Sequence, residues 1–67
     1  MYDKDAMTRL LKSRGVKLRV IAEKLGVTEA TFRNKRKGKT EFTQTEISEF
    51  CDCLRLSDSE RNSVFFA

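Results

Sequence analysis

The spacing of Ala22, Gly26 and Phe32 constrains the fold of this chain most. Ala22 is a small residue in the middle of one helical run, and it allows a second helix to approach closely. Gly26 follows four positions later, where a tight turn needs positive φ. Phe32 comes six positions after Gly26 and is placed to anchor the next helix to a core. The spacing therefore predicts two short helices that cross at about 90–120°.

The helices expected before this turn have clear ends but unequal starts. An amphipathic helix at residues 3–14 begins with an aspartate and stops at Gly15. The next helix, residues 18–25, stops at Gly26. Lys17 stands where a Ser, Thr or Asp would normally cap the helix, so this start is weakly signalled.

Capping residues mark the helices expected after the turn. Thr28 is a good N-cap for residues 29–37, and Gly38 is expected to close that helix in the left-handed conformation. The patterns T-x-x-E and S-x-x-E then predict a fourth helix and a short fifth helix. These capping boxes run from Thr43 to Glu46 and from Ser57 to Glu60. The fold class expected is all-α, with four to five helices.

Apolar residues near the carboxyl end complete the predicted core. The fourth helix is expected to turn Ile47, Phe50, Cys51 and Leu54 inward. Val64 and Phe65 are expected to cover the core of their own chain. Phe66 is left open, because it suits either that core or contact with a second copy.

The size and composition favour one intracellular domain, residues 1–67. The chain has no proline, no histidine and two cysteines. Cys51 and Cys53 point about 200° apart on a helix, so they are expected to be reduced thiols of a cytoplasmic protein. Two cysteines without histidine do not make a zinc site, so neither a metal nor a cofactor is expected. No apolar run is long enough for a membrane span or a signal peptide.

Charge is divided unequally along the chain. Residues 1–40 carry twelve Lys and Arg against four Asp and Glu, a balance of +8, whereas residues 41–67 carry two against six, a balance of −4. Five cations fall within residues 33–39: Arg33, Lys35, Arg36, Lys37 and Lys39. A cationic run is often only a solvated helix face. On a helix that follows a tight turn, it favours contact with duplex DNA.

The run LRVIAEKLGVTEATFRNKRKG, residues 18–38, resembles the DNA-binding domain of lambda-repressor-like proteins, which include phage repressors, Cro and Xre regulators. The F-T-x-x-E-I pattern at residues 42–47 resembles a segment common in small regulators of this group. The resemblance covers roughly residues 5–56 and implies a helix-turn-helix formed by the second and third helices. Lys35 departs from the family, which usually has an apolar residue there. The last turn of the third helix is therefore expected to be short or frayed.

The resemblance also implies which side chains read DNA. The base-reading candidates are Glu29, Ala30, Arg33 and Asn34. Arginine suits guanine, asparagine suits adenine, and an alanine methyl suits the thymine methyl. Glu29 suits a cytosine amino group, or it simply favours the amino end of the helix. The phosphate-binding candidates are Arg19, Thr28, Thr31, Arg36, Lys37, Lys39 and Thr40.

These features favour a sequence-specific transcriptional regulator, expected to be a repressor that binds a palindromic operator as a homodimer. A second possibility is the antitoxin of a toxin–antitoxin pair or another protein-interaction module. Its acidic surface for a basic partner would be Glu46, Glu49, Asp52, Asp58 and Glu60. Enzymatic activity is the weakest of the three hypotheses, because no nucleophile–base arrangement or phosphate-binding glycine loop is present. No small-molecule substrate is expected.

Overall fold

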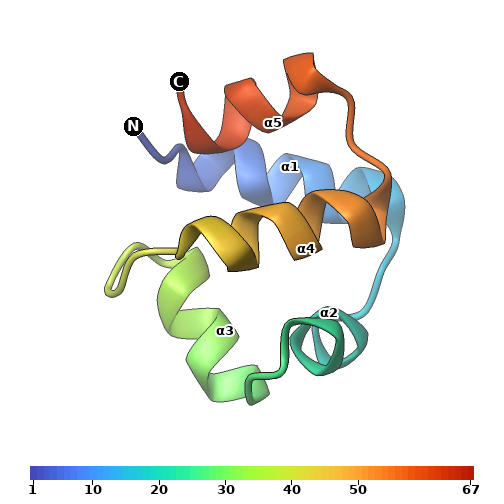
Figure 1. The fold of residues 1–67 in the computed structure, drawn as a ribbon, viewed down its shortest axis with the longest axis vertical. Helices are drawn as coiled ribbons and strands as arrows, with labels where there is room; N and C mark the ends of the chain where they lie inside the picture. Colours follow the sequence, from blue (N-terminus) through green and yellow to red (C-terminus); the bar gives the residue numbers. More distant parts are fainter.

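The computed structural model describes residues 1–67, which form five α-helices and no strand (Figure 1). The helices are α1 (Lys4–Arg14), α2 (Leu18–Leu25), α3 (Glu29–Arg36), α4 (Gln44–Leu54) and α5 (Asp58–Phe65). The all-α prediction is confirmed. No helix is long and apolar enough to cross a bilayer.

The helix starts follow the capping residues of the sequence. The Asp3 carboxylate accepts hydrogen bonds from two amides in the first turn of α1. Complete capping boxes open α4 and α5, as predicted. Lys17 gives α2 no side-chain cap, which confirms the weak start. Side-chain oxygens thus satisfy the amides that open four of the five helices.

The helix ends agree with the sequence except at α3. Gly15 and Gly26 take the left-handed conformation expected after α1 and α2, with φ of 65° and 73°. The prediction that Gly38 is the C-cap of α3 is wrong by one residue. Lys37 is the cap, in right-handed backbone geometry, and Gly38 follows it with φ of 87°. At Gly15, Gly26 and Gly38 the absence of Cβ permits this positive φ without strain.

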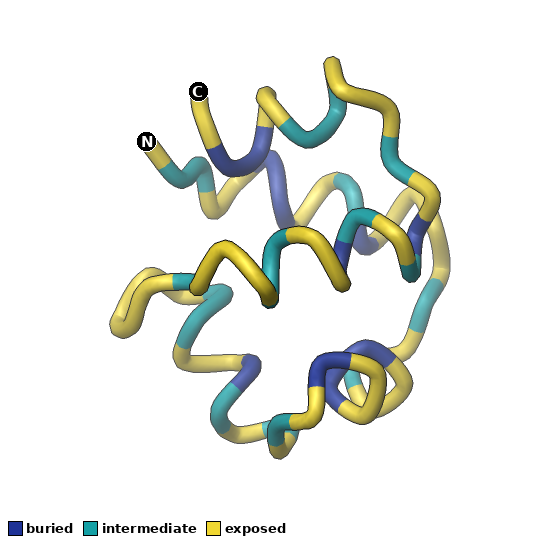
Figure 2. The backbone as a smooth tube through the Cα atoms, viewed as in Figure 1, coloured by how far each residue is buried: buried dark blue, intermediate teal, exposed yellow.

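The core is one cluster of buried apolar side chains contributed by all five helices. It consists of Ala6, Met7, Leu11, Ile21, Ala22, Leu25, Phe32, Phe50, Leu54, Val64 and Phe65. Figure 2 shows the buried segments on the sides of the helices that face one another. Ile47 and Cys51 pack against this cluster but are only half-buried. Val64 and Phe65 cover the core as expected, whereas Phe66 is 51% exposed.

The two chain ends lie side by side, on the other side of the molecule from the turn between α2 and α3 (Figure 1). The Asp3 amide donates to the Val64 carbonyl at 2.7 Å, and the Ala67 amide donates to the Met1 carbonyl at 3.0 Å. Helix α1 packs against α5, and α2 packs against both α3 and α4. This arrangement leaves one side of α3 open to solvent.

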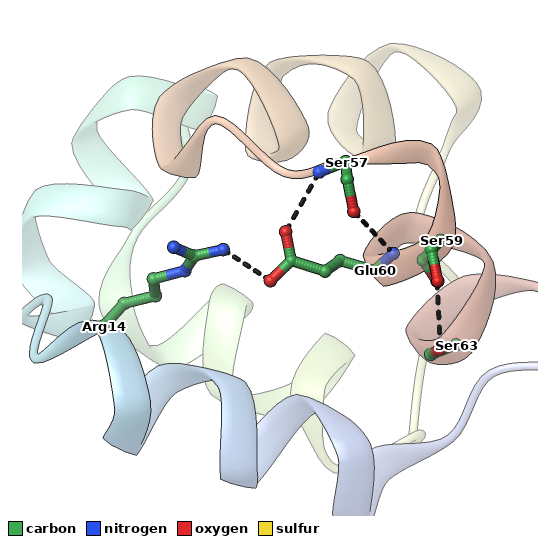
Figure 3. A network of polar contacts seen from close by, with 5 residues as sticks. All are labelled: Arg14, Ser57, Ser59, Glu60 and Ser63. Carbon is green, nitrogen blue, oxygen red and sulfur yellow. Dashed lines mark hydrogen bonds and ion pairs between the residues drawn. The ribbon is translucent and has the colours of Figure 1, made fainter.

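A polar network joins α1 to α5 (Figure 3). One carboxylate oxygen of Glu60 accepts a hydrogen bond from the Ser57 amide, and the other accepts one from the Arg14 guanidinium. The Ser57 hydroxyl completes the capping box by accepting from the Glu60 amide. The capping glutamate of α5 is therefore also its ionic link to α1.

Candidate nucleic-acid interface

One aromatic side chain determines how α3 is rotated about its axis. Phe32 is fully buried, and its ring lies 6.2 Å from the Phe50 ring and 6.1 Å from the Phe42 ring. Aromatic pairs at these separations add to the free energy of burial. The ring cannot leave the cluster without opening a large cavity, so the opposite side of α3 is held toward solvent.

The side of α3 opposite Phe32 carries polar and small side chains. At roughly 100° per residue, Ala30, Asn34 and Lys37 lie about 140–160° from Phe32, and Arg33 lies about 100° from it. All four are exposed. A methyl group, an amide, an ammonium and a guanidinium therefore share one accessible helix face. We call Ala30, Arg33, Asn34 and Lys37 the outer face of α3.

Two of the base-reading candidates contact each other. The Arg33 guanidinium lies 3.7 Å from the Glu29 carboxylate, with side chains 51% and 43% exposed. An exposed pair at this i, i+4 spacing contributes only about 0.3–0.5 kcal/mol. The guanidinium is therefore steered along the outer face without being locked there, and it remains free to bind another acceptor.

The two threonines at the start of α3 share a hydrogen bond. The Thr28 hydroxyl accepts from the Thr31 amide at 3.1 Å, which caps the helix. The two hydroxyl oxygens lie 3.0 Å apart, with Thr28 donating to Thr31. The hydroxyl proton of Thr31 remains available to an outside acceptor such as a phosphate oxygen.

The other phosphate-binding candidates differ in accessibility. Lys37, Lys39 and Thr40 are exposed in the segment that follows α3, and Arg19 is exposed in the first turn of α2. Arg36 is half-buried, and its Nε atom is buried without a hydrogen-bond partner. The structure therefore leaves four of these five side chains on the surface and turns Arg36 partly inward.

Lys35 does not share the exposure of the other cations in the basic run. Its side chain is only 12% exposed, and its Nζ atom lies 3.0 Å from a Glu46 carboxylate oxygen. The same Nζ donates to the Glu41 carbonyl oxygen at 2.9 Å. Sequence reasoning counted Lys35 with the cationic surface. Its position three residues after Phe32 already indicated that this side chain faces the core. Where the family usually has an apolar residue, this chain has a lysine that pairs with Glu46.

Glu46 is the partner of Lys35 and part of the α4 capping box. Its carboxylate accepts from the Thr43 amide at 2.9 Å. Burial raises the pKa of Glu46, but the hydrogen bond from the Thr43 backbone and the contact with Lys35 outweigh it and lower that pKa overall. The carboxylate is thus ionised at neutral pH and joins the end of α3 to the start of α4.

Tyr2 holds the end of α3 from the amino terminus of the chain. Its hydroxyl donates to the Arg36 carbonyl oxygen at 2.7 Å. Its ring lies 5.4 Å from the Phe42 ring and 6.0 Å from the Phe65 ring. Burial raises the pKa of Tyr2 to about 12, although nearby Arg36 acts in the opposite direction. The phenol is therefore a neutral donor at neutral pH, and no sequence pattern pointed to this contact.

The last turn of α3 was expected to be short or frayed, and the structure shows the first alternative: the helix ends at Arg36, one residue earlier than predicted, and its end is hydrogen-bonded. A helix normally leaves four carbonyl groups unsatisfied at its carboxyl end. Here the Lys37 amide donates to the Arg33 carbonyl, the Gly38 amide to the Lys35 carbonyl and the Lys39 amide to the Asn34 carbonyl. The Tyr2 hydroxyl donates to the fourth carbonyl, that of Arg36. The helix is short, but its end is ordered by tertiary contacts.

Comparison with protein families, curated proteins and solved structures finds no match to this chain. No group of three or more His, Cys, Asp or Glu side chains is placed to hold a metal ion. The functional interpretation therefore depends on the geometry and chemistry of α2, α3 and the cationic segment that follows them.

Proposed function

We propose that this protein binds double-stranded DNA, with α2, residues 26–28 and α3 acting as a helix-turn-helix and α3 entering the major groove. The observation that carries the proposal is the outer face of α3, which is exposed, cationic and held in one orientation by Phe32. A major groove about 12 Å wide admits an α-helix. A rigid helix with donors on one face is what reading base edges requires.

The outer face has the chemistry for direct readout. In this proposal Arg33 donates two hydrogen bonds to guanine, Asn34 pairs with adenine, and Ala30 contacts a thymine methyl. Glu29 either accepts from a cytosine amino group or keeps the Arg33 guanidinium aligned, and the 3.7 Å contact between them supports the second role.

Cations and hydroxyl groups near the outer face would bind the DNA backbone. Lys37, Lys39 and Thr40 follow α3 directly and are exposed. Thr28, Thr31 and Arg36 lie at its two ends, and Arg19 lies on α2 beside uncapped amides. Such contacts position a protein on DNA and make binding strongly salt-dependent, while base contacts supply the sequence preference.

The biological role that fits such binding is a small transcriptional regulator, most simply a repressor that blocks a promoter. One copy would contact about one half-site, so two copies would be expected on a two-fold symmetric operator with half-sites about 34–36 Å apart. Exposed Phe66 remains available to such a pairing.

The alternative, an antitoxin or protein-interaction module, has less support from the structure. Its acidic surface includes Glu46 and Glu60, and both carboxylates are engaged in capping boxes and ion pairs within the chain. Glu49, Asp52 and Asp58 remain exposed. Three exposed carboxylates are also what solubility alone would require.

Selection of duplex DNA from a random pool at near-physiological salt tests the proposal. We expect a two-fold symmetric motif to be enriched. On that motif, Arg33→Ala should cost about 1–3 kcal/mol and relax the preference at one base pair. Lys39→Ala, the control, should weaken binding to all sequences alike and reduce the salt slope by about one. Enrichment of no motif, or unchanged specific binding by Arg33→Ala, would contradict this docking of α3.

A further inference from the structure

We propose that Lys35 and Tyr2 are positioning residues that hold the carboxyl end of α3 for DNA reading, and that Lys35 makes no contact with DNA. This inference rests on the proposed function. It separates one lysine from the four other cations of residues 33–39, which their charge alone does not distinguish.

The surroundings of Lys35 leave little of its ammonium for a phosphate. An ammonium has three N–H donors, and here the Glu46 carboxylate and the Glu41 carbonyl lie within 3.0 Å of it. Only 12% of the side chain is exposed. A phosphate oxygen would have to displace a carboxylate that is itself held by the Thr43 amide.

The place of Lys35 on α3 leads to the same conclusion. It lies about 60° from Phe32 around the helix and about 100° from Asn34. This is the flank of α3 that reaches α4, not the outer face. Lys37, two positions further on, has the opposite environment. It is exposed and lies about 140° from Phe32.

Tyr2 restrains the same end of α3 through the backbone. The Arg36 carbonyl has no amide partner beyond the helix, and the Tyr2 hydroxyl is its donor at 2.7 Å. Tyr2 is itself held, because the neighbouring Asp3 amide bonds the Val64 carbonyl and the Tyr2 ring packs on Phe65. The end of α3 is thus tied to α4 through Lys35 and to both chain termini through Tyr2.

Loosening this end should affect specific and non-specific binding differently. Bidentate contacts to bases need their donors within about 0.5 Å of the correct position, so a mobile α3 loses base discrimination. Phosphate attraction depends mainly on how many charges lie near the DNA, and this number sets the salt slope. A positioning residue should therefore change the specificity ratio without changing the slope.

The test compares Lys35→Met with Lys37→Met, the same substitution on the exposed outer face. Affinity is measured for the selected duplex and for an unrelated duplex of equal length, over about 50–200 mM salt. Circular dichroism identifies a temperature at which every variant is folded. We expect Lys35→Met to lower the specific-to-non-specific ratio about tenfold with an unchanged slope. Lys37→Met should instead reduce the slope by ~0.9 on both duplexes.

Two further variants extend the test, and the first of them keeps the inference testable if Lys35→Met does not fold. Tyr2→Phe keeps the ring and removes only the hydroxyl, and it should lower the ratio about threefold with the slope unchanged. Lys35→Met combined with Glu46→Gln should lower the ratio no further than Lys35→Met alone, because Lys35 acts through that carboxylate.

Three outcomes would overturn the inference. A slope reduced by about one in Lys35→Met would show that Lys35 binds a phosphate. An unchanged ratio in both folded Lys35→Met and Tyr2→Phe would show that the contacts serve stability alone. Failure of the wild-type chain to bind any duplex would overturn the proposed function itself, and it is visible before any variant is made.

Discussion

The starts of α4 and α5 carry the same local motif in different surroundings. Each has a hydroxyl N-cap and a glutamate three residues later, and each glutamate also pairs with a cation from an earlier helix. At α4 the pair is Lys35–Glu46, with side chains 12% and 14% exposed. At α5 it is Arg14–Glu60, with side chains 33% and 39% exposed.

The difference shows that a capping box does not by itself determine how much its glutamate contributes to stability. A pair screened by solvent contributes little, because water stabilises the separated charges almost as well. A pair with little solvent access loses much of that alternative, so removing one partner leaves a poorly solvated charge. The α3–α4 contact should therefore be the more important of the two, both for stability and for the orientation of α3.

The largest expected effect is on the α3–α4 pair. Lys35→Met should lower the free energy of unfolding by about 1–3 kcal/mol, because Glu46 then loses a charged hydrogen-bond partner in a half-buried site. Urea denaturation followed by circular dichroism measures the change. Lys37→Met should leave stability unchanged, since its ammonium is exposed. Equal stability of the two variants would show that the Lys35–Glu46 pair contributes no more than an exposed, unpaired lysine does.

Acid should reveal the same contrast with a smaller effect. Burial raises the pKa of Glu46, but the bond from the Thr43 amide and the contact with Lys35 lower it overall. The pKa of Glu60 is lowered as well, mainly by the hydrogen bond from the Ser57 amide and then by Arg14. For a carboxyl whose folded pKa is lowered, the stabilisation is complete above its ordinary value near 4.5 and is lost as pH falls through the folded pKa. Unfolding midpoints measured from about pH 7 to pH 3 should therefore fall on the acid side.

The acid loss should shrink more in Lys35→Met than in Arg14→Gln, because the Lys35–Glu46 pair is less exposed to solvent than the Arg14–Glu60 pair. In either variant each glutamate keeps the hydrogen bond from its N-cap amide, Thr43 for Glu46 and Ser57 for Glu60. If both variants lost the same share of the acid dependence, the two glutamates would be equivalent despite their different exposure.

The smallest expected effect is on the α1–α5 pair. Arg14→Gln should not change the denaturation midpoint measurably, because the pair is exposed and the Ser57 capping box remains (Figure 3). It should also leave the DNA specificity ratio unchanged, since Arg14 touches neither α3 nor α4 in this network. A midpoint shift as large as that of Lys35→Met would show that exposure does not rank these pairs.

Much of the fold could be predicted because its signals are local. Asp3, Thr28 and the two capping boxes each satisfy amides within three residues, so the helix starts need no knowledge of the tertiary structure. Gly15 and Gly26 end helices for the same local reason. Arg55 ends α4 with φ of 52°, and no residue pattern predicted this, because a left-handed arginine depends on the structure around it.

The sequence alone thus determined where the helices lie and that α3 turns Ala30, Arg33 and Asn34 away from the core side marked by Phe32, since helical periodicity and one anchor suffice. Only the tertiary structure decided that Lys35 pairs with Glu46, that Tyr2 bonds Arg36 and that Phe66 stays exposed. These contacts join residues 11 and 34 positions apart, or depend on which face another helix covers. Local preferences do not encode such distances, because they arise when apolar burial brings separate helices together.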